Sequence, residues 1–172
     1  MSHALVPQAP DAAAFAPYGT FVTPPADFGE RAFYSDRLGG GGAGAAPVLH
    51  VNRVRALSLP HGIDTVERHP HADQVFLPLD VARYLVVVMP SDASGDPAPD
   101  RALAFEVPGT LGVVFRTGAW HAGAAVFDRP GSFAVLMWRS GDGDDEFRRI
   151  DPLTIDGRPD RPTATLTSED QT

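Results

Sequence analysis

The chain has 172 residues, 43% of them hydrophobic, which suits one domain and is too short for two ordinary ones. It has no cysteine, so disulfides, thiolate metal sites and a cysteine nucleophile are excluded. Its net charge of −8, from 22 acidic residues against 14 arginines and no lysine, repels nucleic acid and anionic lipid, and we expect neither as a partner.

The N-terminal residues are not expected to be a targeting signal. They lack the basic start and the long apolar run of a signal peptide. The longest apolar stretch, Tyr84 to Met89, is too short to span a bilayer. A chain without cysteine fits a reducing compartment. We therefore expect a cytoplasmic protein that acts on a small molecule.

The first half of the chain predicts one helical turn, a loop and a strand. Residues 11–15 can form a single turn of helix before Pro17. The glycine-rich stretch 39–46 lacks the Lys-Ser/Thr ending of a phosphate loop, and we expect a flexible surface loop there. Residues 49–59 are rich in β-formers with imperfect alternation, and they predict a strand.

The second half predicts four more strands. Residues 84–89 form a continuous apolar run, which is typical of a strand buried on both faces. Residues 102–107 and 132–139 alternate in hydrophobicity, and 111–115 form another short run. Residues 91–100 are expected to be a turn-rich linker. The polar, proline-punctuated segment 151–172 is expected to be an extended or frayed tail.

These elements predict an all-β fold. Seventeen glycines and 17 prolines are spread along the chain, which places turns between many short strands. Such spacing favours a sandwich or barrel. A parallel α/β sheet would need crossover connections of about a dozen residues, usually helical, and the gaps do not provide them. We expect one domain over residues 1–172, with its core in 15–150.

The most informative stretch runs from Glu67 to Gln74. In a strand, residues two apart share a face, so Glu67 and His69 point the same way and Arg68 points the opposite way. Gln74 follows a short turn, and a chain that folds back there returns it to the same interior. Clustered titratable groups in a cavity are typical of a functional site.

A second stretch, residues 112–121, contains a strand and a glycine turn that deliver His121 beside Trp120. The spacing of the two stretches resembles the two motifs of the cupin superfamily. Its first motif has a ligand, one residue, a His, about four residues and a carboxylate. Glu67 here replaces the usual first His and Gln74 the usual Glu. The second motif, Pro-x-Gly-x-x-His, matches residues 116–121 except for the missing proline.

A narrower resemblance accounts for these departures. The chain is similar to the ureidoglycolate lyase family, formerly called ureidoglycolate hydrolase. The matching stretches, in order, are Phe15–Gly19, Val51–Arg53, Glu67–Pro70, Gln74–Pro78, Val86–Val88, Gly109–Gly112 and Trp120–His121. Members of the family often carry a second His after Trp-His, where this chain has Ala122.

The resemblance implies a cupin-like double-stranded β-helix, or jelly-roll, that forms a homodimer. It also implies cleavage of ureidoglycolate to glyoxylate and urea in the breakdown of allantoin and purines. That chemistry needs a base for the hydroxyl proton and an acid for the departing nitrogen. The expected roles are His121 or Glu67 as base, His69 as proton donor or orienter, and Gln74 as a positioning group.

Three further residues are candidates for binding the substrate. Arg53 and Arg116 each carry a planar fork that matches a carboxylate, although a solvated surface role fits them equally well. Trp120 is expected to form a wall of the pocket or part of the core.

The cofactor is left open by the sequence. Glu67, His69, Gln74 and His121 could hold a divalent metal such as Zn, Mn, Fe or Ni, or could work without one. Two other functions therefore stay open. One is a metal-dependent cupin oxygenase or isomerase, and the other is a cupin that binds a small acid without catalysis.

Overall fold

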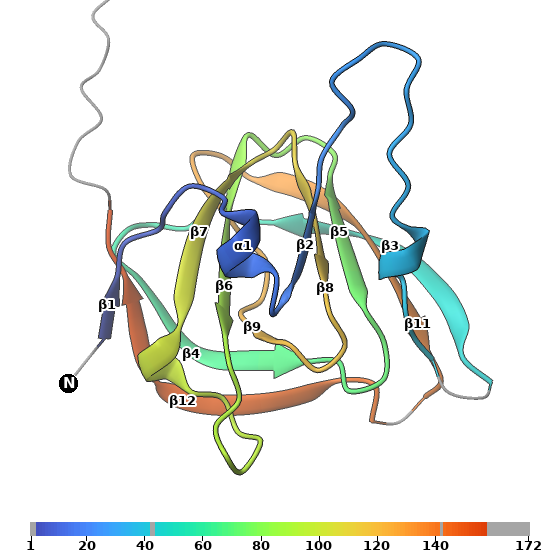
Figure 1. Cartoon of the computed structure of the whole chain (residues 1–172). Helices are drawn as coiled ribbons and strands as arrows, with labels where there is room; N and C mark the ends of the chain where they lie inside the picture. The colour runs from blue at the N-terminus through green and yellow to red at the C-terminus, as the bar shows by residue number, and fades with distance from the viewer. Residues whose placement is uncertain (1–2, 42–43, 142, 158–172) are drawn as a thin grey trace, which may run out of the picture.

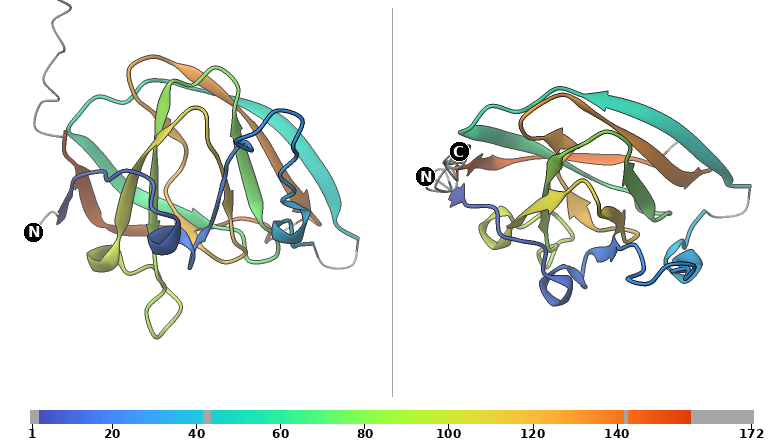
Figure 2. Two further views of the ribbon diagram at one scale, coloured as in Figure 1. Left: turned by 45° about the horizontal axis from the view of Figure 1, so that its top comes forward. Right: turned by 90° about the horizontal axis from the view of Figure 1, so that it is seen from above.

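Two curled sheets form a half-barrel in the computed structural model, which describes residues 3–41, 44–141 and 143–157 (Figures 1 and 2). The larger sheet contains β1 (His3–Leu5), β12 (Glu146–Ile155), β4 (His61–Arg68), β9 (Trp120–His121), β6 (Arg83–Met89), β10 (Ala125–Val126) and β7 (Leu103–Pro108). The smaller sheet runs in the order β2 (Gly19–Val22), β8 (Gly112–Phe115), β5 (Gln74–Pro78), β11 (Gly131–Arg139) and β3 (Ala46–Val54). The predicted cupin-like all-β fold is confirmed.

Strand β6 explains the continuous apolar run in the sequence. Its alternate side chains enter two different clusters of buried residues. Tyr84, Val86 and Val88 pack in the interior between the two sheets. Leu85, Val87 and Met89 pack on the other face, with side chains of β4 and β12. Because both faces are covered, every residue from 84 to 89 is buried, as predicted.

The helical turn predicted near the N-terminus is α1 (Ala12–Phe15), and it closes one end of the interior. The Asp11 carboxylate accepts hydrogen bonds from Ala13 N at 2.9 Å and Ala14 N at 3.1 Å, which caps the helix. The turn buries Phe15 completely, with its ring stacked on Phe21 at a centroid distance of 4.6 Å. A short capped helix is stable here because this ring joins the core.

Two boundaries differ from the prediction. Residues 151–155, expected to begin a tail, complete β12, and Leu153 and Ile155 are fully buried. The arginines and Pro152 in this strand hide its alternation in the sequence, and its register with β4 shifts between Arg149 and Leu153. Strand β3 covers 46–54 rather than 49–59. Residues 42–43 of the expected loop and 158–172 of the expected tail lie outside the described residues.

The expected linker 91–100 does consist of turns, closed by a bridge between Ser91 and Pro97 and followed by the short 3-10 helix η2 (Pro99–Arg101). A second 3-10 helix, η1 (Ser35–Arg37), precedes β3. Among the helices of the described residues, none has the length and apolar character needed to cross a membrane.

Candidate active site

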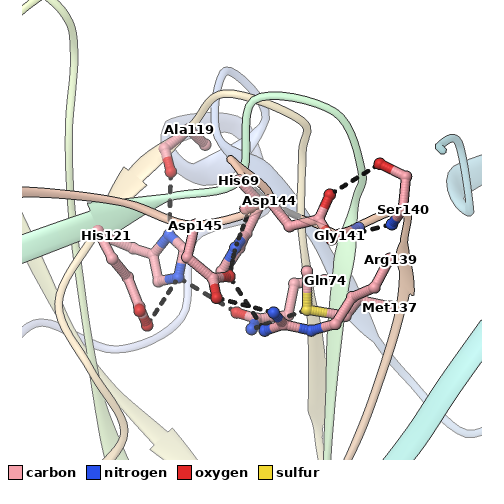
Figure 3. Close-up of polar contacts among 11 residues, drawn as sticks. His69, Gln74, Ala119, His121, Met137, Arg139, Ser140, Gly141, Asp144 and Asp145 are labelled. Carbon is pink, nitrogen blue, oxygen red and sulfur yellow. Dashed lines mark hydrogen bonds and ion pairs between the residues drawn. The ribbon is translucent and has the colours of Figure 1, made fainter. Parts of the chain in front are cut away.

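Four of the residues singled out in the sequence converge inside the half-barrel. Glu67, near the end of β4, lies directly opposite His121 of β9 in the antiparallel register. Gln74, the first residue of β5, lies opposite Met137 of β11. One potential ligand atom each from Glu67, His69 and His121 lies within 4.8 Å of the others. Figure 3 shows the side chains of His69, Gln74 and His121 gathered in this cluster.

The turns that carry these residues are held together by Asp73. Its buried carboxylate accepts hydrogen bonds from Thr117 N at 2.6 Å, Thr117 Oγ1 at 2.7 Å and Gly39 N at 2.6 Å. Gly118 has a φ of 76°, which favours glycine, and its N–H donates to the backbone oxygen of His69 at 2.8 Å. The glycine turn of the second motif is thereby fixed beside the first motif.

His121 is buried and contacts three acceptors. Its Nδ1 lies 2.9 Å from the backbone oxygen of Ala119, so Nδ1 donates there. Its Nε2 lies 3.2 Å from Gln74 Oε1 and 3.6 Å from Glu67 Oε1. The ring stacks on Phe115 with centroids 4.1 Å apart. Both atoms beside Nε2 are therefore oxygen acceptors.

At His69 the described residues place hydrogen-bond acceptors beside Nδ1 only, and Nε2 has none. Its Nδ1 lies 3.3 Å from the backbone oxygen of Asp144 and 2.9 Å from Asp145 Oδ1 (Figure 3). Its Nε2 is buried and has no hydrogen-bond partner among the described residues. Two acceptors at Nδ1 select the tautomer with the proton there, which leaves a lone pair on Nε2.

Burial and neighbouring groups shift the pKa values of Glu67 and His69. Burial alone raises the pKa of Glu67, but the interactions with His121 and His69 outweigh it, and the pKa is lowered. Burial and the neighbouring His121 lower the pKa of His69, against the raising effects of Glu67 and Asp145. At neutral pH Glu67 is therefore a carboxylate and His69 a neutral imidazole.

The same atoms fit a divalent metal ion. Imidazole nitrogens and carboxylate oxygens are suitable ligands for Zn, Mn, Fe or Ni. The unpartnered Nε2 of His69 is free to coordinate, with Glu67 and His121 in range and the amide oxygen of Gln74 as a weaker fourth ligand.

Sequence reasoning missed the pair formed by Arg139 and Asp145. The Arg139 guanidinium donates from NH1 to Asp145 Oδ2 at 2.8 Å and from NH2 to Asp145 Oδ1 at 3.0 Å. Arg139 follows Met137 on the inward face of β11, and this alternation could have indicated it. Asp145 lies in the turn before β12, where no spacing signal points to the cluster.

The structure does not bring Arg53, Arg116 or Trp120 into the cluster. The register places Asn52 opposite the buried Phe133, so Arg53 faces outward, where it pairs with Asp80 at 3.5 Å. Phe115 points into the core, so Arg116 points the other way, into a separate hollow on the outside of the smaller sheet.

Trp120 precedes His121 and therefore lies on the opposite face of β9. Its indole nitrogen donates to the backbone oxygen of Gly95 at 3.2 Å, and the Arg68 guanidinium lies 4.4 Å from the ring centroid. Arg68 also pairs with Glu146 at 2.6 Å, which confirms that it faces away from the cluster. Trp120 is a core residue and not a wall of the site.

A family model described as Ureidoglycolate lyase matches residues 2–155. The chain belongs to the ureidoglycolate lyase family. The chain is 31% identical over 152 residues to a ureidoglycolate lyase of Chelativorans sp., covering 83% of this chain and 90% of that protein. It is 31% identical over 139 residues to one of Burkholderia mallei, covering 76% and 79%. A ureidoglycolate lyase of Rhodobacter capsulatus is 41% identical over 105 residues, or 60% of this chain and 63% of that protein.

Proposed function

We propose that this protein is a ureidoglycolate lyase that cleaves ureidoglycolate to glyoxylate and urea in the breakdown of allantoin. Family membership supports the substrate class. The observation that carries the chemistry is the buried lone pair of His69 Nε2, close to an imidazole of His121 whose Nε2 lies 3.6 Å from the Glu67 carboxylate. A proton acceptor and a proton donor side by side are what an elimination across a carbon–nitrogen bond requires.

The reaction divides between the two histidines. His69 Nε2 accepts the proton of the substrate hydroxyl, the C–O bond becomes a carbonyl, and the C–N bond breaks. His121 Nε2–H gives a proton to the departing urea nitrogen, and the carboxylate of Glu67 stabilises the protonated ring. One proton is taken up and one released, so proton exchange restores the site. These roles reverse those expected for the two histidines from the sequence.

Arg139 takes the place of Arg53 and Arg116 as the proposed anchor for the substrate carboxylate. It lies on the inward face of β11, and its side chain is 34% exposed. Its NH1 and NH2 contact Asp145, and its Nε has no partner among the described residues. A guanidinium with a free N–H group and a partly exposed surface can still bind a carboxylate.

A metal-dependent cupin enzyme is the second candidate, favoured by the convergence of Glu67, His69 and His121. A bound divalent ion would supply Lewis acidity to a substrate oxygen. The decisive experiment is to mix chelator-treated protein with ureidoglycolate and measure glyoxylate. Turnover without metal supports acid–base catalysis by the side chains. Turnover restored only by one metal supports the metal-dependent enzyme, and binding without turnover on any metal supports a non-catalytic acid-binding protein.

The proposed assembly is a homodimer in the cytoplasm. Support for the dimer comes from the outward face of the smaller sheet, where Leu49 is 69% exposed, Val51 62% and Leu77 41%. Apolar side chains on one face of a sheet are typical of an interface. The cysteine-free composition suits a reducing compartment. Light scattering of the wild type and of Leu49→Asp tests the dimer, because a buried aspartate in the interface would produce monomers.

A further inference from the structure

One edge of the His69 ring is held by the turn between β11 and β12. The Asp144 carboxylate accepts hydrogen bonds from Ser140 N and Gly141 N, both at 2.9 Å, and from Ser140 Oγ at 3.1 Å. These bonds fix the turn from within. The backbone oxygen of Asp144 and the carboxylate of Asp145 are thereby held against Nδ1 of His69 (Figure 3).

Asp145 is itself held by two parallel contacts. The fork of Arg139 binds both of its oxygens, at 2.8 and 3.0 Å, which is the bidentate geometry that fixes a carboxylate most firmly. Asp145 Oδ1 lies 2.9 Å from His69 Nδ1 while it accepts from Arg139. The carboxylate can therefore neither rotate away from the imidazole nor approach the substrate side of the ring.

The consequence appears at the opposite edge of the ring. His69 is 4% exposed, and its Nε2 has no partner among the described residues. We propose that Asp145 is a positioning residue that aims the Nε2 lone pair of His69 into the site. This inference rests on the proposed lyase function for its kinetic effect, but the orientation of the ring does not depend on it.

The kinetic test compares Asp145→Asn with a matched control. Asp128→Asn removes a similar bidentate pair, in which Arg83 donates to both oxygens of Asp128 at 2.6 Å, away from the cluster. Asp128 has a φ of 62°, which asparagine tolerates. Loss of the outer partner that orients a metal-ligating histidine typically costs 10- to 100-fold in affinity or activity, and we expect kcat of Asp145→Asn to fall by a similar factor of roughly 10 to 100. We expect KM to change by a smaller factor than kcat, since Asp145 itself contacts no substrate in the proposed mechanism and the Arg139 guanidinium is retained.

The same kcat in Asp145→Asn and Asp128→Asn, within about twofold, would overturn the proposal. A merely structural role would lower the thermal stability of both variants without this difference in kcat.

A second measurement needs no substrate. In protein labelled with 15N-histidine, we expect His69 of the wild type to carry its proton on Nδ1 and none on Nε2. In Asp145→Asn the Nδ1 proton should move to higher field, because a neutral amide oxygen is a weaker acceptor than a carboxylate. A proton on Nε2 in the wild type, or an unchanged Nδ1 resonance in the variant, would contradict the proposal. If these spectra behave as expected while the wild type does not cleave ureidoglycolate, the proposed function fails and the positioning role stands.

Discussion

Replacing His121 with asparagine distinguishes the role of Nδ1 from the role of Nε2. The asparagine amide nitrogen can take the place of Nδ1 and keep the bond to the Ala119 oxygen, which is 2.9 Å from Nδ1. No atom of asparagine reaches the place of Nε2, which lies 3.2 Å from Gln74 Oε1 and 3.6 Å from Glu67 Oε1. The substitution therefore removes the proposed proton donor and leaves the backbone contact of residue 121 intact.

The expected loss of activity is large compared with the loss of stability. General acid catalysis typically contributes 10²- to 10⁴-fold, so kcat/KM should fall by about that factor, or about 3–5 kcal/mol in activation free energy. The fold loses the ring stacked on Phe115, worth about 0.5–1.5 kcal/mol. It also loses the hydrogen bond between Nε2 and the Gln74 amide oxygen, worth about 0.5–1.5 kcal/mol. The sum is below the stability of a typical domain, so the variant should fold.

The assay follows glyoxylate by coupled oxidation of NADH, with circular dichroism as a check of folding. His61→Asn is the matched control, because His61 is half-buried at the start of β4 and lies outside the cluster. We expect the control to retain its activity. A folded His121→Asn that keeps kcat/KM within about threefold of the wild type would refute proton donation by His121.

Three further results are expected. Arg139→Lys should raise KM roughly tenfold, because an ammonium does not bind a carboxylate through two parallel bonds, and an unchanged KM would rule out the anchor. Phe133→Ala should cost about 3–5 kcal/mol in urea unfolding, because Phe133 is fully buried, and a loss below about 1 kcal/mol would contradict its place in the core. The hydrogen bond from Arg68 lowers the pKa of Glu146 in the folded protein. The ionised Glu146 carboxylate therefore stabilises the fold at pH values above the pKa of Glu146 in the unfolded chain. This stabilisation is lost as the pH falls through the lower pKa of the folded state. The difference in Tm between wild type and Glu146→Gln should therefore be present at about pH 7 and vanish near about pH 2, whereas a constant difference would contradict the linkage.

The sequence predicts the cluster better than it predicts the surroundings of the cluster. Strand parity is local, so it correctly relates Glu67 to His69 and separates both from Arg68. Motif spacing adds Gln74 and His121, which the structure places together. Asp145 could not be predicted this way. It approaches His69 only because β12 pairs with β4, a contact between residues 75 or more positions apart.

The inner face of β3 shows why the sequence could not place Arg53. In this strand the polar His50 and Asn52 lie on the inward face, opposite Val135 and Phe133 of β11. The apolar Leu49 and Val51 lie on the outward face. The usual rule of apolar inside and polar outside is therefore inverted. Parity alone could not assign a side to Arg53, because the sequence does not indicate which face of β3 is the inner one.

The departures from the usual cupin motif change the charge and the hydrogen-bonding groups of the cluster. Glu67, in place of a histidine, lies directly across the strand pair from His121, with its carboxylate 3.6 Å from Nε2 of that ring. Gln74, in place of a glutamate, adds an acceptor without a second negative charge. The lone pair of His69 stays free beside the His121 imidazole, so the proposed mechanism has its base and its acid in one cluster. This combination suits the elimination of urea from a carbinol carbon.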